Sequence, residues 1–339
     1  MKPTNFAYHL TTYLSKYLPG KAGISHNTIL SYRDTFSLLL RFCSEDKAMT
    51  IEKITLKTLT RNLIDEFLTW LETQRGCAVS TRNQRLAAIH SFFRYLQIEE
   101  PGHLFTCQQI LAISMKRTAR KVINYLTLDA IKTILEAPDT ACLMGRRDLV
   151  LLSLMYDTGA RVQEIADLTV ADVRLENPPT VKMTGKGNRS RIVPLMTPTA
   201  KLLEQYLSER DLKHAEYGSR HVFQNRSLAK LTRAGIAYIL NKYVEAARML
   251  HPELIPKKIS PHCFRHSKAM HLLQSGVNLV YIRDFLGHAT IKTTEMYARA
   301  DSLMKRNALE KAYQISFPSE MPVWQQNHGL LKWLKELGH

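Results

Sequence analysis

Residues 149–168 read LVLLSLMYDTGARVQEIADL, and this stretch sets the pattern for the second half of the chain. The apolar run at 149–156 predicts a buried helix that stops at Thr158 and Gly159, because glycine supplies the left-handed backbone of a helix C-cap. A new helix is expected from 161 to 168. The stretch therefore predicts two helices joined by a tight turn, with Arg161 at the start of the second.

The one stretch with a good β-strand pattern follows shortly after this turn between the two helices. Residues 180–184 and 191–195 are separated by GKGNRS at 185–190, which is typical of a β-hairpin. The rest of the second half predicts helices, up to a proline-containing break at 317–322. We therefore expect a mainly α fold with a small antiparallel β-sheet.

The first 110 residues also predict helices. Apolar residues recur at three- and four-residue steps from Ile29 to Cys43, and a second helix is expected at 63–73. A third helix is expected to begin after Ser80 and Thr81, which are good N-cap residues. Its first turns carry three side chains that are candidates for DNA contact or, alternatively, for an ordinary solvated face: Arg82, Asn83 and Arg85.

A chain of 339 residues and 38.9 kDa favours two domains. We interpret residues 114–124 as a basic interdomain linker between a helical domain at 1–113 and a second domain at 125–316, with a tail helix at 317–339. The linker is either a merely exposed tether or a contact to DNA phosphates. Its cationic residues are Lys116, Arg117, Arg120 and Lys121.

Charge indicates a polyanionic partner. Lysines and arginines number 47 against 30 acidic residues, giving a net charge of +17. Residues 1–115 contain 13 basic and 9 acidic residues, so both halves share the excess. This spread favours nucleic acid over a membrane or an acidic protein. Without a transmembrane run or signal-peptide core, and with five cysteines never in CxxC pairs, we expect a cytoplasmic, DNA-bound protein without disulfides or zinc.

Four short segments hold an unusual share of the cationic and imidazole groups. They are TGARVQE at 158–164, TGKG at 184–187, PHCFRH at 261–266 and LGHAT at 286–290, the last followed by Tyr297. Together they supply two arginines, three histidines, a lysine and a tyrosine. A metal-free phosphoryl-transfer site needs such cations, donors and a nucleophile around one phosphate.

In this order and spacing, the segments resemble the tyrosine recombinase (phage integrase) family, over residues 125–299. The first domain is similar to the family's DNA-binding, core-binding domain, although less specifically. Ala160 and the pair Cys263-Phe264 depart slightly from the family's usual residues. The resemblance implies a catalytic set, with Glu164 in support, of Arg161, Lys186, His262, Arg265, His288 and Tyr297.

The residues themselves suggest a role for each group in such a site. Tyr297 would attack phosphorus. Since a free phenol has a pKa of about 10, it needs a base or a strong local positive potential, and His262 is the favoured helper. Lys186 on the hairpin would protonate the leaving 5′ oxygen. Glu164 is expected to orient Arg161, and His288 to donate to a phosphate oxygen.

Each of these residues also has a simpler interpretation. Arg-x-x-Glu is usually a surface ion pair and GKGN usually a turn, and Thr180 rules out a nucleotide-binding P-loop. The histidines have no carboxylate or cysteine at a metal-ligand spacing, and His266 is interpreted as a packed helix residue. The rival nucleophiles are Tyr243, Tyr281 and Tyr313.

The resemblance implies a site-specific DNA recombinase that works through a 3′-phosphotyrosyl intermediate and a Holliday junction, without metal, ATP or other cofactor. Its implied partners are double-stranded DNA with paired half-sites and three further copies of the chain. The tail helix at 317–339 would dock either on a neighbouring protomer or on its own domain. The alternatives are a type IB topoisomerase and a non-catalytic DNA-binding regulator. The sequence leaves integration, transposition, inversion and dimer resolution open.

Overall fold

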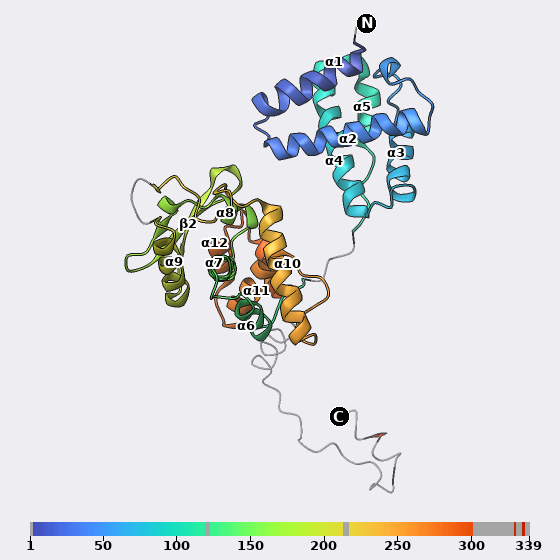
Figure 1. Cartoon of the computed structure of the whole chain (residues 1–339). Coiled ribbons are helices and arrows are strands. Elements are labelled where there is room, and N and C mark those ends of the chain that lie inside the picture. Colours follow the sequence, from blue (N-terminus) through green and yellow to red (C-terminus); the bar gives the residue numbers. More distant parts are fainter. Residues whose placement is uncertain (1–2, 119–122, 213–216, 301–328, 330–333, 336–339) are drawn as a thin grey trace. The chain divides into compact units, whose positions relative to one another are not determined.

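The structure, a computed structural model, describes residues 3–118, 123–212, 217–300, 329 and 334–335. The chain divides into two compact units, Met1–Lys121 and Val122–His339, each with its own hydrophobic core (Figure 1). The expected tail helix at 317–339 and the rival Tyr313 lie outside the described residues. Among the helices that are described, none is both long and apolar enough to cross a membrane.

The first unit is helical and is built around aromatic side chains. Phe92 lies at the centre, with its ring 5.1 Å from Phe36, 5.2 Å from Tyr13 and 6.0 Å from Phe6. These edge-on contacts join three helical segments to a fourth. The elements are α1 (Asn5–Thr12), the π-helix η1 (Tyr13–Lys21), α2 (His26–Glu45), the 3₁₀ turn η2 (Ile51–Lys53), α3 (Arg61–Thr73), α4 (Val79–Glu99), the 3₁₀ turn η3 (Pro101–His103) and α5 (Leu104–Leu111).

Helix α4 begins earlier than the sequence predicted. Ser80 and Thr81 lie inside its first turn, and the N-cap residue is Ala78, which has no capping side chain. The N–H groups of Thr81 and Arg82 both donate to the carbonyl of Ala78, so the helix is already closed at that residue. Backbone hydrogen bonds therefore define the start of α4, and not the capping side chain on which the prediction relied.

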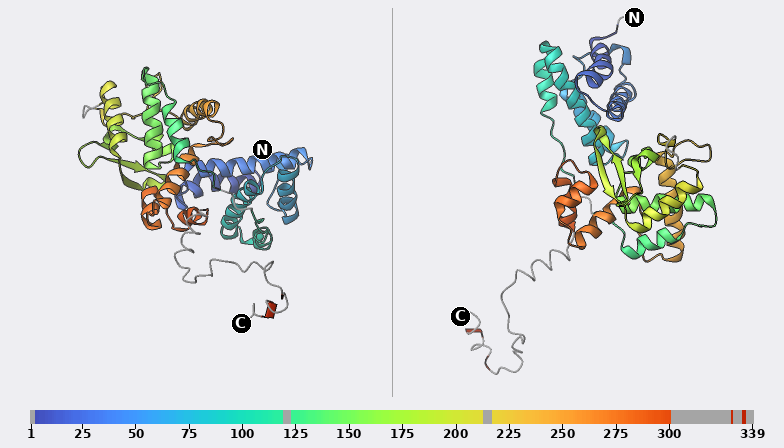
Figure 2. Two further views of the ribbon diagram at one scale, coloured as in Figure 1. Left: turned by 90° about the horizontal axis from the view of Figure 1, so that it is seen from below. Right: turned by 90° about the vertical axis from the view of Figure 1, so that its left-hand side faces the viewer.

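The second unit is also mostly helical, and the predicted fold class of helices with a small antiparallel sheet is confirmed. Helix α7 packs between α9 and α11, and the sheet lies beside α8 and α12 (Figure 2). Its elements are α6 (Leu128–Glu136), α7 (Leu143–Thr158), α8 (Val162–Asp167), η4 (Val170–Asp172), β1 (Val173–Arg174), β2 (Thr180–Thr184), η5 (Lys186–Asn188), β3 (Ser190–Pro194), α9 (Thr197–Glu209), α10 (Arg233–Leu250), α11 (Pro261–Gln274), α12 (Leu279–Leu286) and α13 (Lys292–Ala300).

The sheet has the order β1-β2-β3, and all its pairs are antiparallel. Strands β2 and β3 form the predicted hairpin, with Val181 opposite Val193 and both side chains buried. Strand β1 was not predicted, because two residues are too short to show an alternating pattern. The hairpin turn follows Gly185, whose N–H donates to the carbonyl of Arg189 at 2.9 Å.

The corner between α7 and α8 has the backbone that the sequence predicted. Gly159 caps α7 with a φ of 55°, in the left-handed region that favours glycine. A Cβ at this position would also lie 2.9 Å from a methyl group of Leu286, the last residue of α12. Glycine therefore lets the end of α7 approach the end of α12 closely.

Candidate active site

Arg161 is held at the corner between α7 and α8 by a carboxylate one turn further along the chain. It is the N-cap residue of α8, and its backbone N–H donates to Oε2 of Glu164 at 2.9 Å. Its guanidinium donates to Oε1 at 2.9 Å, while the side chain remains 37% exposed. Glu164 therefore fixes Arg161 at two points and leaves part of the guanidinium open.

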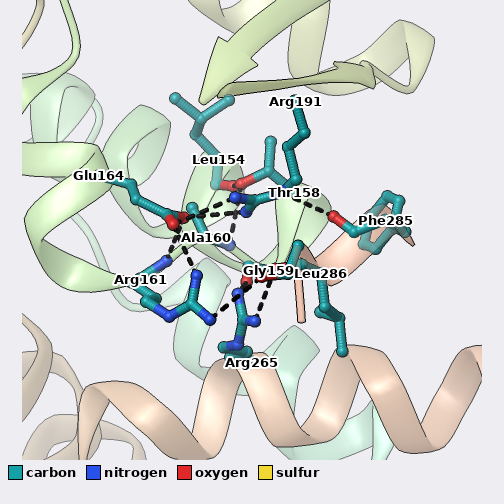
Figure 3. A network of polar contacts seen from close by, with 11 residues as sticks. Leu154, Thr158, Gly159, Ala160, Arg161, Glu164, Arg191, Arg265, Phe285 and Leu286 are labelled. Atoms are coloured by element: carbon teal, nitrogen blue, oxygen red, sulfur yellow. Dashed lines mark hydrogen bonds and ion pairs between the residues drawn. The ribbon is translucent and has the colours of Figure 1, made fainter. Parts of the chain in front are cut away.

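A second arginine, Arg191 of β3, shares the same carboxylate (Figure 3). Its two terminal nitrogens donate to the Glu164 oxygens at 3.1 and 2.9 Å, and its Nε donates to the carbonyl of Phe285 at 2.8 Å. Burial alone raises the pKa of Glu164, but the hydrogen bonds from Arg191 and Arg161 outweigh it and hold that pKa below its ordinary value. The charged carboxylate thus ties the hairpin to α8.

Arg265 of α11 is almost fully buried and joins the ends of two helices. One terminal nitrogen donates to the carbonyl of Gly159 at 2.7 Å, and the other donates to the carbonyl of Leu286 at 2.6 Å. Burial, followed by repulsion from Arg161, lowers the pKa of Arg265 to about 10. That pKa leaves the guanidinium charged at neutral pH. A fixed positive charge therefore lies where α7 and α12 end.

His288 follows the left-handed Gly287 that caps α12. Its Nδ1 is 2.9 Å from the hydroxyl oxygen of the fully buried Thr294. Burial and three nearby arginines lower the pKa of His288 to about 4, the largest charge effects coming from Arg265 and Arg161. The imidazole is therefore neutral at pH 7.

Tyr297 of α13 belongs to a small core formed with α11 and α12, and its side chain is only 1% exposed. Its hydroxyl lies 2.9 Å from Nδ1 of His266, and its ring stacks on that of His288 with 6.3 Å between centroids. Burial raises the pKa of Tyr297, while Arg265 and Arg161 are near enough to oppose the rise. The phenol is therefore a protonated group beside two guanidinium charges.

His262 lies in the first turn of α11 and is exposed. Its ring is 6.2 Å from that of His266, centroid to centroid. Desolvation, followed by the charges of Arg265 and Arg161, lowers the pKa of His262. His262 therefore borders the cluster, while His266 makes the contact to the phenol.

Lys186 is the first residue of the turn η5 between β2 and β3, and its side chain lies outside the described part of the structure. The hairpin borders a cavity of about 500 Å³ that also reaches the turn between α12 and α13. The residues that line the cavity are Arg161, Glu164, Gly185, Arg189, Ser190, Arg191, Asp284, Gly287, His288 and Ala289.

Two residues of this cluster were not singled out from the sequence as part of a site. Arg191 shares the inward face of β3 with the buried Val193, and a cation at an inward position of a short strand is a signal that could have found it. His266 was interpreted as packing only. It lies one helical turn after His262, a spacing that places both rings along one face of α11.

The candidate DNA contacts at the start of α4 are engaged within the first unit. Arg82 is buried and donates to the carbonyl of Ser114 at 3.2 Å. Asn83 makes two hydrogen bonds to the backbone of Lys116, at 2.7 and 3.1 Å. Arg85 donates to the carbonyl of Ser31 at 3.0 Å. Arg82 and Asn83 thus hold the chain segment that leaves α5, and Arg85 holds α4 against α2.

Two of the four basic residues of the expected linker are described. Both Lys116 and Arg117 are exposed, and the ammonium of Lys116 is 2.6 Å from a carboxylate oxygen of Glu72. Arg120 and Lys121 lie outside the described residues.

Family models match most of the chain. Residues 124–303 match the phage integrase family, and residues 11–100 match the N-terminal SAM-like domain of phage integrases. These two ranges include most of the first domain and all of residues 125–299, on which the resemblance to tyrosine recombinases rests. Fold and site thus define a helical, two-unit protein with a cationic cluster around a buried tyrosine. The chain belongs to the phage integrase family and is a tyrosine recombinase, an enzyme of DNA recombination.

Named relatives and solved structures agree with this assignment. The y4rC protein of Sinorhizobium fredii, an integrase/recombinase by name, is 34% identical over 99% of both chains. The tyrosine recombinase XerD of Listeria innocua is 30% identical over 87% of this chain and 95% of its own. Among solved structures, XerH site-specific recombinase shares the fold with a TM-score of 0.67 at 22% identity, covering 88% of this chain and 84% of its own.

Proposed function

We propose that this chain cuts one DNA strand at a time with Tyr297, which forms a 3′-phosphotyrosyl bond and frees a 5′-hydroxyl. An incoming 5′-hydroxyl from a partner duplex then attacks the phosphotyrosine, giving strand exchange through a Holliday junction. The phosphotyrosine conserves the bond energy, so the exchange needs neither ATP nor a metal. The observation that supports this most directly is the convergence of Tyr297, Arg161, Arg265 and His288 at one corner of the second unit.

The two arginines would bind the non-bridging oxygens of the scissile phosphate. Arg265 is fixed by two carbonyls and Arg161 by Glu164, so neither has to be ordered when DNA binds. Two fixed charges stabilise the extra negative charge of a pentavalent transition state. By analogy with oxyanion-hole donors, each contributes about 3 kcal/mol to lowering the barrier.

Three further groups would complete the site. His288 and the exposed His262 would donate to phosphate oxygens once DNA is bound. Lys186, at the tip of the hairpin, would protonate the departing 5′ oxygen, a step worth roughly 10²- to 10⁴-fold in rate.

The partner would be double-stranded DNA carrying paired half-sites, with four copies of the chain on two sites. The net charge of +17 supports a polyanionic partner. The solved structures of XerH and of the Tn1549 transposon integrase, which share the fold at 22% and 15% identity, are DNA complexes by title. Lys116 and Arg117, with Arg120 and Lys121, would contact phosphates. The buried Arg82 would support that region by holding its backbone, and the partly exposed Asn83 and Arg85 would approach the DNA.

A nicked suicide substrate tests the proposal, using a duplex first selected for tight binding to the protein. Loss of the short strand beyond the cut prevents religation, so a covalent adduct accumulates on a denaturing gel. The wild type should form the adduct, and Tyr297→Phe should not. Tyr281→Phe is the matched control, because that tyrosine is 71% exposed and should leave the yield unchanged. A wild type without adduct on a duplex that it binds would overturn the proposal.

Strand exchange is tested separately with two labelled duplexes. Recombination predicts four-way junctions and exchanged products. Relaxation of supercoiled DNA without junctions would instead support the type IB topoisomerase alternative.

A further inference from the structure

The contact between His266 and the buried phenol has no part in the mechanism above. We propose that His266 is a catalytic base, which takes the hydroxyl proton of Tyr297 as the phenol attacks the scissile phosphate. The proposal rests on the function proposed above. It moves the proton acceptor from His262, which the sequence favoured, to a residue one helical turn further along α11.

The geometry places one acceptor on the reacting atom. Nδ1 of His266 lies 2.9 Å from the phenol oxygen of Tyr297, within the 2.6–3.2 Å that a general base requires. The two rings are tilted by 59°, with 5.7 Å between centroids. When the ring proton is on Nε2, Nδ1 accepts a hydrogen bond from the phenol, and this tautomer is the one the reaction uses. Helices α11 and α13 pack together, so the pair is fixed by the core around it.

Electrostatics keep the His266 ring neutral before DNA binds. Burial, followed by His262 and Arg265, lowers its pKa to about 4, so at pH 7 Nδ1 is free to accept a proton. Two further titratable groups face the Tyr297 side of the pair: His288, which is neutral at pH 7, and Arg161, whose charge opposes the rise in the pKa of the phenol. A DNA phosphate between the arginines brings negative charge, which offsets the repulsion from Arg265 and raises the pKa of His266. The base therefore becomes stronger when the substrate arrives.

The step balances without another reactant. A bond forms between the phenol oxygen of Tyr297 and phosphorus, and the bond from phosphorus to the 5′ oxygen breaks. The phenol proton moves to Nδ1 of His266, and the 5′ oxygen receives a proton from the acid, for which Lys186 is proposed. In the reverse step, His266 returns its proton to the phenol oxygen as a 5′-hydroxyl attacks the phosphotyrosine.

The contact has a simpler explanation, in which His266 only holds Tyr297 in a buried resting position. The two explanations predict opposite effects of removing the imidazole. Loss of a base makes cleavage slower, whereas loss of a restraint makes cleavage faster. The experiment must therefore measure the rate of the chemical step and not only the final yield.

The same helix provides a matched control. His271 of α11 lies with its Nδ1 2.8 Å from the hydroxyl of Tyr156, and this second His–Tyr pair is half-buried. Burial lowers the pKa of His271 and raises that of Tyr156, as in the first pair. Only the first pair includes the proposed nucleophile. Equal substitutions in both pairs separate loss of a base from loss of a helix contact.

The test compares His266→Asn with His271→Asn in single-turnover cleavage of the nicked substrate. Asparagine keeps a hydrogen-bonding group near Nδ1 but cannot take a proton. We expect His266→Asn to form the adduct about 10²- to 10³-fold more slowly at pH 7. The deficit should shrink as the pH rises toward the pKa of the phenol. His271→Asn should stay within about threefold of the wild type. Measurements of DNA affinity and of thermal melting check that both variants are folded.

A substrate with sulfur in place of the 5′ bridging oxygen adds a readout that separates base from acid. A thiolate leaves without being protonated, so this substrate restores activity to a variant that lacks the acid. It should rescue Lys186→Ala and leave His266→Asn slow. His266→Asn as fast as the wild type, faster than it, or rescued by sulfur would overturn the base assignment while the recombinase proposal stands. An inactive wild type would instead overturn the proposed function itself.

Discussion

Arginines near the starts of two helices have different partners in the two units. In the first unit, Arg82 and Arg85 of α4 donate to the backbone of residues far along the chain, Ser114 and Ser31. In the second unit, Arg161 at the start of α8 is oriented by a carboxylate and keeps more than a third of its side chain exposed. Arg82 and Arg85 therefore stabilise the packing of the first unit, whereas Arg161 borders a cavity.

The difference shows that charge alone does not identify a ligand site. A guanidinium has five N–H donors, and what matters is how many remain available beside a reactive group. Arg265 has both roles, since it donates hydrogen bonds to two backbone carbonyls and its charge also acts on Tyr297. Substitutions in the two units should therefore have separable effects, on chemistry in one and on stability or DNA affinity in the other.

Replacing Arg265 should have the largest effect. Arg265→Ala removes a buried charge beside Tyr297 and leaves the carbonyls of Gly159 and Leu286 without their donor. We expect adduct formation to slow by about 10³-fold, together with a loss of stability of about 2 kcal/mol. Single-turnover cleavage and urea unfolding measure the two effects. Activity close to that of the wild type would contradict the role of the buried charge.

Replacing Glu164 should mainly reduce stability. Glu164→Gln leaves the largely buried Arg191 without a counter-charge, which destabilises the second unit by about 3 kcal/mol in urea unfolding at pH 7. The folded pKa of Glu164 lies below its ordinary value of 4.5, so its stabilisation is complete above pH 4.5 and is lost as the pH falls through the folded pKa. The difference between wild type and variant should therefore narrow below pH 4.5. A constant difference down to pH 3 would contradict the ion-pair explanation.

Gly159→Ala tests the close approach of α7 and α12. The new methyl group would lie 2.9 Å from a methyl group of Leu286, and the alanine backbone would have to adopt a φ of 55°. We expect a stability loss of about 1–3 kcal/mol and slower cleavage, because both helix ends hold Arg265. Ala160→Gly at the neighbouring position is the control for a general effect on the corner. A more stable Gly159→Ala variant would show that the corner has room that the structure does not indicate.

The smallest effect is expected in the first unit. Arg117→Ala should weaken binding to all duplexes alike and reduce the slope of log affinity against log salt by about 0.9. Cleavage of bound DNA should not change, in contrast to the arginine variants of the second unit. Filter binding between 50 and 200 mM salt measures the slope. An unchanged slope would indicate that Arg117 contacts no phosphate.

The sequence predicted the elements that carry strong local signals. The glycine C-cap at Gly159, the hairpin at 180–195 and the helical class are all present in the structure. It missed β1, which is too short for a pattern, and it placed the start of α4 after Thr81, whereas the helix begins at Val79.

The contacts within the site depend on tertiary packing, which local patterns do not contain. The sequence named Arg161, Glu164 and Arg265 but could not show that Arg191 would share the carboxylate of Glu164. It favoured His262 as the base and interpreted His266 as a packed helix residue. Only the packing of α13 against α11 shows which of the two rings meets the phenol.

The central claim is that Tyr297 becomes covalently joined to DNA, and peptide mass spectrometry of the trapped adduct tests it most directly. After nuclease and protease digestion, the account predicts a 3′-linked nucleotide on the peptide that contains Tyr297. A nucleotide on another tyrosine, such as Tyr281 or Tyr243, would contradict it.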